Sequence, residues 1–281
     1  MDDQANLAIG DDAARRLEAD GLLHMADRPF RLTPEESELL TAAHADPRAK
    51  NVSLSASGEQ LRGAACEGPA AERLAALMRR YADWAEALVA EVAPRYLQTL
   101  ERGRTSFRSR DADEAPSSPR KDDRRMHVDA FASQPTRGRR ILRVFSNINP
   151  DGEPRVWNVG EPFEAYARRW AAVVRSPFPG EAWALARLGI TRSRRSAYDF
   201  LMLGLHDNAK LDARYQTTAP RREIAFAAGT SWIVFTDQVV HAALAGRYAL
   251  EQTFYLPVAA MGDQALSPLR ILERLTGRTL A

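Results

Sequence analysis

The spacing of hydrophobic positions changes near residue 100. From Gly68 to Val92 the apolar residues recur at helical intervals, which predicts one long amphipathic helix packed on a core. Upstream, Thr33, Pro34 and Glu36 form a capping box with proline in the first turn, which predicts a helix start. We therefore expect residues 1–100 to form an N-terminal helical region packed on the rest of the chain.

Residues 101–281 contain short runs of β-forming residues separated by turns. Strands are expected at 105–108, 141–147, 155–159, 223–226, 231–236 and 247–258, with 228–230 as a tight turn. Helices are expected at 163–174, 181–187 and 198–211, and a further helix near the C-terminus. Many short strands with inserted helices predict an α+β fold whose core is a double-stranded β-helix, or jelly roll.

The segment from Glu101 to Arg125 has a distinct composition. Its basic residues alternate with acids around the stretch Ala115-Pro116-Ser117-Ser118-Pro119. This pattern predicts a strand fragment followed by a mobile, solvated loop. Because the segment leads directly into His127, a lid over a binding site is the alternative interpretation.

The basic residues are unevenly divided between two types. The chain of 281 residues carries a net charge of only +2, yet 36 of its 39 basic residues are arginines and three are lysines. Codon bias in a GC-rich genome explains such a ratio, whereas recognition of phosphate or carboxylate would give it a function. Both explanations are compatible with the sequence.

Cys66 is the single cysteine, so the chain has no intrachain disulfide that would require an oxidising compartment. The N-terminus is acidic and has no apolar signal core, and the apolar stretch 225–246 resembles two buried strands and a turn. We therefore expect a cytoplasmic protein that could still attach to a membrane surface.

The candidate chemistry centres on His127, Asp129 and His241. In a strand, positions i and i+2 point to the same face, so His127 and Asp129 could bind one metal, and His241 on a later strand would complete the set. Two histidines and one carboxylate form the facial triad of non-haem Fe(II) oxygenases. Taken alone, a His-x-Asp pair is weak evidence. A competing pair, His206 and Asp207, is expected on a helix, where adjacent side chains diverge by about 100° and chelate poorly.

The residues around this triad are more specific than the triad itself. The region from about Met126 to Pro257 resembles the Kdo (3-deoxy-D-manno-oct-2-ulosonic acid) hydroxylase family, and the first hundred residues resemble it more loosely. The matching stretches are His127-Val128-Asp129-Ala130-Phe131, Asn147-Ile148-Asn149-Pro150, Leu205-His206-Asp207-Asn208, 138–145, 154–157, 198–203, 232–238, 241–242 and 250–254.

The resemblance implies a reaction and its cosubstrates. It implies an Fe(II)/2-oxoglutarate-dependent dioxygenase that uses O2 to hydroxylate C3 of the Kdo sugar on lipid A or its precursor, with succinate and CO2 as co-products. It also implies that Arg247 resembles the arginine that opens the last core strand and binds the distant carboxylate of 2-oxoglutarate. The spacing of six residues from His241 is shorter than usual and implies a tight hairpin. A surface arginine at the turn is the alternative for Arg247.

Other residues are weaker candidates for contact with the two anionic ligands. Asn147 and Gln252 could hydrogen-bond 2-oxoglutarate or sugar hydroxyls. Arg140, Arg143 and Arg155 are candidates for the carboxylate or phosphates of the substrate, unless each pairs with a nearby acid. Such a substrate further implies peripheral contact with the inner membrane, with no obligate protein partner.

Two other functions remain compatible with the sequence. One is an Fe(II)/2-oxoglutarate oxygenase acting on another anion such as nucleic acid, although acids interrupt the basic residues, which argues against a continuous basic groove. The other is a non-catalytic jelly-roll protein, which would have no need to keep His127, Asp129 and Arg247.

Overall fold

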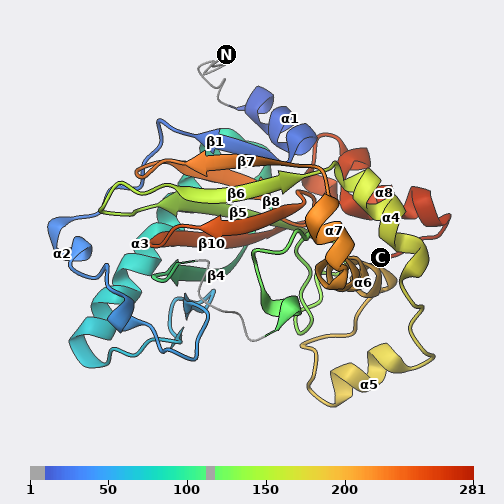
Figure 1. Ribbon diagram of the computed structural model, residues 1–281, viewed down its shortest axis with the longest axis horizontal. Coiled ribbons are helices and arrows are strands. Elements are labelled where there is room, and N and C mark those ends of the chain that lie inside the picture. Colours follow the sequence, from blue (N-terminus) through green and yellow to red (C-terminus); the bar gives the residue numbers. More distant parts are fainter. Residues whose placement is uncertain (1–9, 112–117) are drawn as a thin grey trace.

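The computed structural model describes residues 10–111 and 118–281, and its strands form two antiparallel sheets (Figure 1). The larger sheet has the order β1 (Leu22–Met25), β8 (Ser231–Phe235), β5 (Arg140–Asn147), β10 (Ala249–Leu256), β4 (Glu101–Arg108), β2 (Val52–Leu54) and β3 (Leu61–Arg62). The smaller sheet has the order β7 (Arg221–Phe226), β6 (Arg155–Gly160) and β9 (His241–Ala245). Phe145 and Trp232 of the larger sheet pack against Trp157 and Phe226 of the smaller one, so an aromatic cluster joins the sheets.

Helices cover the outside of this pair of sheets. They are α1 (Asp11–Asp20), α2 (Pro34–Ser37), α3 (Gly68–Val92), α4 (Phe163–Trp170), α5 (Glu181–Arg187), α6 (Ala197–Leu211), α7 (Ala213–Thr218) and α8 (Pro268–Thr276). The Tyr81 hydroxyl of α3 donates to the carbonyls of Val144 and Leu250, which fixes α3 against the larger sheet. Helices α4, α6, α7 and α8 gather at one end of the sheets, whereas α5 projects from the body (Figure 1).

The N-terminal region is less helical than its sequence predicts. The predicted helix 68–92 is confirmed as α3, and the capping box is present, since Thr33 and Glu36 exchange side-chain-to-backbone hydrogen bonds. However, β1, β2 and β3 also come from this region and extend both edges of the larger sheet. Strands of two to four residues show too little alternation to be recognised, and they gain their stability by pairing with an existing edge.

Two predicted turns connect the sheets instead of forming hairpins. The turn at 228–230 leads from β7 in the smaller sheet to β8 in the larger, and residues 246–248 lead from β9 to β10 in the same way. The tight hairpin expected at Arg247 is therefore wrong. Gly246 is required there, because its φ is +103° and a side chain would lie 2.7 Å from Arg155 Cα.

The alternation of side chains along β5 places Arg140 and Arg143, two arginines that the sequence grouped together, on opposite faces of the strand. Leu142 and Val144 join the core beneath α3, whereas Phe145 faces the smaller sheet. Arg140 shares the face of Leu142 and Val144, and its fully buried guanidinium pairs with Asp237, with 2.8 Å between Nε and Oδ2. The expectation that Arg140 contacts the substrate is corrected, because its side chain lies on the wrong face of the strand.

Replacing Arg140 with methionine is expected to lower the free energy of unfolding by about 3–5 kcal/mol, since Asp237 would remain buried without its partner. Burial already raises the pKa of Asp237, and the charge of Arg140 opposes that rise. Urea denaturation followed by circular dichroism measures the change. The double variant Arg140→Met/Asp237→Leu removes both charges and should recover much of the loss. A double variant no more stable than Arg140→Met would refute this explanation.

Candidate active site

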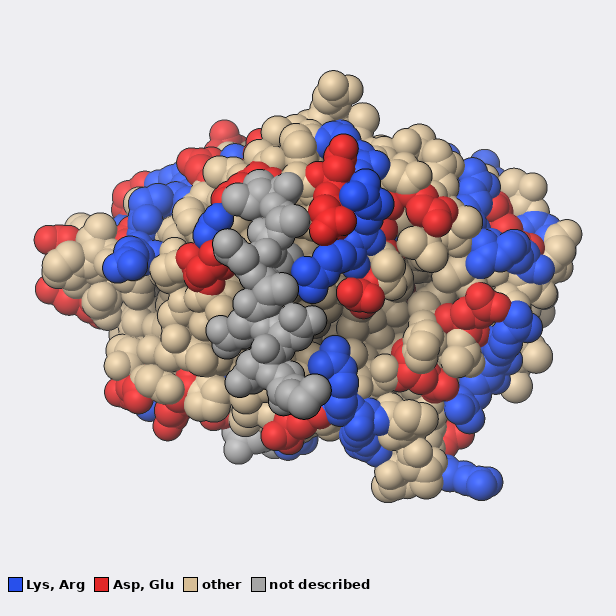
Figure 2. Space-filling model, turned by 90° about the horizontal axis from the view of Figure 1, so that it is seen from above, with Lys and Arg blue, Asp and Glu red and all other residues tan. Residues whose placement is uncertain are grey.

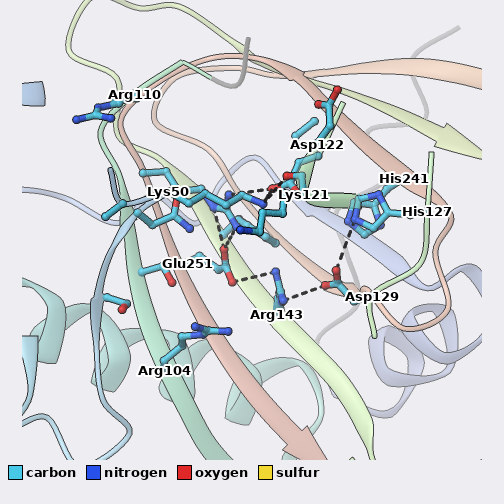
Figure 3. A pocket seen from close by; sticks show the side chains of 18 of the residues that line it. Lys50, Arg104, Arg110, Lys121, Asp122, His127, Asp129, Arg143, His241 and Glu251 are labelled. Atoms are coloured by element: carbon cyan, nitrogen blue, oxygen red, sulfur yellow. Dashed lines mark hydrogen bonds and ion pairs between the residues drawn. The ribbon is translucent and has the colours of Figure 1, made fainter. Parts of the chain in front are cut away.

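The fold brings His127, Asp129 and His241 together (Figure 3). One potential ligand atom from each lies within 4.8 Å of the others, and the two imidazole rings are 4.6 Å apart. The backbones of His127 and His241 exchange two hydrogen bonds, and the Asp129 N–H donates to Thr236. The segment carrying His127 and Asp129 is thus tied to β9 by a single bridge and is not the regular strand that the sequence predicts.

Both imidazoles are oriented by backbone carbonyls. Nδ1 of His127 lies 2.6 Å from the Arg125 carbonyl, and Nδ1 of His241 lies 2.9 Å from the Val239 carbonyl. Since a carbonyl only accepts, each Nδ1 carries the proton, and each Nε2 keeps a lone pair for a metal. Burial, with a smaller effect from the Lys210 charge, lowers the pKa of His127 to about 3, and burial also lowers that of His241. Both rings are therefore neutral at physiological pH, as metal ligands must be.

Arg143 holds the carboxylate of this three-residue set. Its Nη2 lies 2.9 Å from Oδ2 of Asp129, and its Nη1 lies 3.0 Å from Oε1 of Glu251 (Figure 3). Burial alone would raise the pKa of Asp129, but the charge of Arg143, together with smaller contributions from His127 and His241, outweighs burial and holds this pKa well below its usual range. Arg143 thus keeps Asp129 ionised and fixes its orientation. Because two carboxylates already engage its guanidinium, its main task is to position the ligand.

These residues fit a divalent transition metal. Two neutral imidazoles and one carboxylate are the donor set of non-haem Fe(II), and they leave other coordination positions open. Trp157 stacks on the ring of His241, with 5.0 Å between centroids, and closes the inner side of the site. The opposite side opens into a cavity.

The cavity has a volume of about 950 Å³ and a basic lining. Five acidic side chains contribute to its walls, against ten basic ones: Arg48, Lys50, Arg104, Arg108, Arg110, Arg120, Lys121, Arg143, Arg155 and Lys210. This excess of positive charge suits an anionic ligand.

Arg155 is the cation in this cavity that most clearly lacks a counter-charge. Its side chain is buried, at 3% exposure, and Nη1 donates to the Gly246 carbonyl, but Nε has no hydrogen-bond partner. It forms no ion pair with any residue that the structure describes. Burial, reinforced by the Arg108 charge, lowers its pKa to about 10, which still leaves it charged at neutral pH. A buried, unpaired guanidinium is costly unless an anion binds to it.

The position of Arg155 relative to the triad is set by β6. Arg155 and Trp157 share one face of this strand, about 7 Å apart along it. Because Trp157 stacks on His241, the spacing of about 7 Å along β6 places Arg155 on the side of the triad, as a short dicarboxylate held at both ends would require.

Asp123 organises a second group of charges at the cavity wall. Its carboxylate lies 2.6 Å from Lys50, 3.6 Å from Arg108 and 3.7 Å from Lys210, so it joins the N-terminal region, β4 and α6. Burial would raise its pKa, but Lys50 and Arg108 hold it below the usual range. Sequence reasoning missed this group because its members are far apart in the chain.

Three predicted ligand contacts lie outside the cavity. Arg247 is 42% exposed and its Nη2 lies 2.8 Å from Asp151, because β10 begins only at Ala249 and the positive φ of Tyr248 turns the chain. It is therefore not placed to anchor a buried carboxylate.

Gln252 and Asn147 are also committed elsewhere. Gln252 lies on the face of β10 opposite to Glu251, where it bonds to Thr105 and to the Gly103 carbonyl. The Asn147 amide donates to the carbonyls of Glu153 and Phe226 and so stabilises the end of β5. The structure places neither side chain at the cavity.

His206, which the sequence suggested was structural, lines the cavity. Its ring centroid lies 5.3 Å from that of His127, and its Nδ1 is 2.9 Å from Asp207. The helical spacing of residues 198–211 could not indicate that His206 lines the cavity, because this placement depends on how α6 crosses the segment around His127.

Known proteins share this architecture. The chain matches the 3-deoxy-D-manno-oct-2-ulosonic acid (Kdo) hydroxylase family over residues 2–279. It is 42% identical to the Kdo hydroxylase KdoO, described as a non-heme Fe(II) alphaketoglutarate dependent dioxygenase. The alignment with the apo structure of KdoO has a TM-score of 0.91 and covers 96% of this chain and 90% of the KdoO chain. The KdoO complex with alphaketoglutarate and Fe(III) also gives 0.91, with 96% and 91% covered, and the cobalt(II) complex gives 0.92 with the same coverage. No curated protein matches the chain.

Proposed function

The chain belongs to the Kdo hydroxylase family of Fe(II)/2-oxoglutarate-dependent dioxygenases, and from this premise we propose how its residues act. The proposed reaction hydroxylates C3 of the Kdo sugar on Kdo-lipid A to give the 3-hydroxylated octulosonic acid. It consumes 2-oxoglutarate and O2 and releases succinate and CO2. The observation that carries the proposal is a neutral two-histidine, one-carboxylate set opening into a cavity with a buried, unpaired arginine.

His127, Asp129 and His241 are the proposed Fe(II) ligands. When bound, Fe(II) supplies the redox chemistry by which an oxygen atom from O2 reaches the sugar. The chain supplies orientation: the Arg125 and Val239 carbonyls fix the two imidazoles, and Arg143 holds Asp129. Trp157 keeps water from the inner side of His241.

Arg155 is the proposed anchor for the distant carboxylate of 2-oxoglutarate. Its guanidinium has an unused Nε and lies on the strand face that carries Trp157. A carboxylate there would supply the missing counter-charge by charge-assisted hydrogen bonds. This assignment replaces Arg247, and it moves Arg155 from sugar recognition to cosubstrate recognition.

The outer cavity is the proposed site for the anionic sugar. Arg104 and Lys121 line it, are exposed, and form no ion pair with a residue in the described part of the chain (Figure 3). They are available for the carboxylate of Kdo or for a phosphate of lipid A. On the face seen in Figure 2, basic and acidic side chains are interspersed, so that face gives no reason to favour a nucleic acid.

Within the described residues, no helix is both long and apolar enough to span a bilayer. We propose peripheral contact with the cytoplasmic face of the inner membrane, because lipid A is anchored in a membrane by its acyl chains.

Purified protein with Fe(II), 2-oxoglutarate, O2 and Kdo-bearing lipid A precursor should add one oxygen atom to the sugar. Mass spectrometry of the lipid, with succinate measured in parallel, tests this outcome. Succinate without modified lipid would leave the oxygenase class standing and overturn the substrate. Iron-loaded protein that produces neither would contradict the catalytic assignment.

A further inference from the structure

Exposed apolar side chains are concentrated in one segment. Seven large hydrophobic side chains are exposed in the described part of the chain, and five of these lie between residues 173 and 190: Val173, Phe178, Trp183, Leu188 and Ile190. Phe178 is 70% exposed and Trp183 is 58% exposed. Residues 173–195, called here the α5 lobe, include the helix that projects from the body in Figure 1. Such a concentration marks a contact surface, because exposed hydrophobic residues without a function are normally scattered singly over a protein.

The same lobe is strongly basic. It contains five arginines and a single acid, Glu181, which pairs with Arg175. Arg187, Arg192 and Arg194 are exposed, and none of the three forms an ion pair with a residue in 10–111 or 118–281. Exposed apolar side chains and unpaired arginines in one segment complement a surface that is apolar inside and anionic outside.

The base of the lobe is connected to the cavity rim. The Arg192 N–H donates to the Ser133 carbonyl at 2.9 Å, and the Arg195 guanidinium donates to the Ala132 carbonyl. The adjacent Phe131 lines the cavity. The base of the α5 lobe is thus hydrogen-bonded to the segment that lines the cavity at Phe131.

We propose that the α5 lobe is the membrane-docking surface, with Phe178 and Trp183 entering the headgroup region of an anionic bilayer and the arginines binding lipid phosphates. This inference rests on the proposed function, since docking there would bring a lipid-anchored sugar to the cavity mouth. A second copy of the chain is a poorer occupant, because its own lobe would present the same positive charge.

Vesicle binding tests the proposal without depending on catalysis. The probes are vesicles of phosphatidylethanolamine with phosphatidylglycerol, free of any Kdo lipid, and vesicles of phosphatidylcholine alone. The wild-type protein should cosediment with the anionic vesicles more strongly than with the neutral ones. Phe178→Ser/Trp183→Ser should weaken this binding by roughly tenfold for each removed side chain.

A matched control changes two exposed apolar residues outside the lobe. Leu97→Ser/Leu211→Ser removes side chains that are 42% and 45% exposed, and it should bind vesicles like the wild type. The lobe variant should still form succinate with a water-soluble, deacylated Kdo substrate, which shows that it is folded.

Equal vesicle binding by the lobe variant and the wild type would overturn the inference. So would a wild-type protein that ignores anionic vesicles but self-associates through the lobe in sedimentation velocity experiments. Lobe-dependent vesicle binding by a protein that leaves Kdo-lipid A unmodified would instead refute the proposed substrate alone.

Discussion

Replacement of His127 or His241 by alanine is expected to lower hydroxylation by more than about a thousandfold, because the proposed metal contributes several kcal/mol to the reaction barrier. Each replacement removes one Nε2 donor from the three-ligand set and leaves the cavity open. The fold should survive, since α3, the larger sheet and the aromatic cluster between the sheets do not depend on either imidazole.

Metal content and thermal unfolding of the purified variants check the two parts of this expectation. The variants should bind less than a stoichiometric equivalent of Fe(II) or Co(II), while circular dichroism remains like that of the wild type. His24→Ala is the matched control, because His24 is exposed on β1 and does not line the cavity. Full turnover by either triad variant would refute the ligand assignment.

The parts of the site that sequence predicts best are those with a local signature. Histidine and aspartate two residues apart point to a common ligand, and the structure brings them to His241 even though their segment forms only one bridge. The boundaries of α3 and α6 were also predictable within a residue, because each has enough turns to establish a helical period.

The proposed anchor was harder to predict because its position depends on which sheet each strand joins. Arg247 stands at the expected place in the sequence, but the turn at Gly246 carries the chain between sheets and leaves its side chain outside. Arg155 is on β6, in the smaller sheet, and reaches the cavity only because β6 pairs with β9 beside His241. Pairing of this kind is set by tertiary packing and leaves no local pattern.

The charges around Arg155 explain why this buried arginine forms no ion pair although acidic side chains line the same cavity. Glu251 is engaged by Arg108 and Arg143, and Asp123 is engaged by Lys50, with Arg108 nearby. These pairs leave the cavity acids little capacity for another cation. The cavity therefore contains a preformed place for one additional carboxylate.

Arg155→Met is expected to raise the concentration of 2-oxoglutarate needed for half-maximal succinate formation by about ten- to a hundredfold. A change of this size is expected because the variant loses one charge-assisted interaction with the cosubstrate. Titration of 2-oxoglutarate into the Co(II)-loaded protein should show the same weakening without turnover. Arg247→Ala, the matched control, removes an exposed guanidinium paired with Asp151 and should leave both values unchanged. The opposite result, with Arg247→Ala weakened and Arg155→Met unaffected, would return the anchor to Arg247.

Arg155→Met should weaken 2-oxoglutarate binding but should not lower the stability of the ligand-free protein. This difference distinguishes a binding role for Arg155 from a structural one. Without ligand, Arg155 is a buried cation with an unsatisfied Nε, so methionine of similar length removes a desolvation cost and gives up one bond to the Gly246 carbonyl. The variant should therefore unfold at a urea concentration equal to or above that of the ligand-free wild type. Added 2-oxoglutarate should stabilise the Co(II)-loaded wild type more than the variant. The opposite result would be a variant that unfolds at a lower urea concentration than the wild type and is stabilised by 2-oxoglutarate to the same extent. It would show that Arg155 stabilises the fold, because a cation kept for ligand binding lowers the stability of the ligand-free protein and its ligand restores that stability.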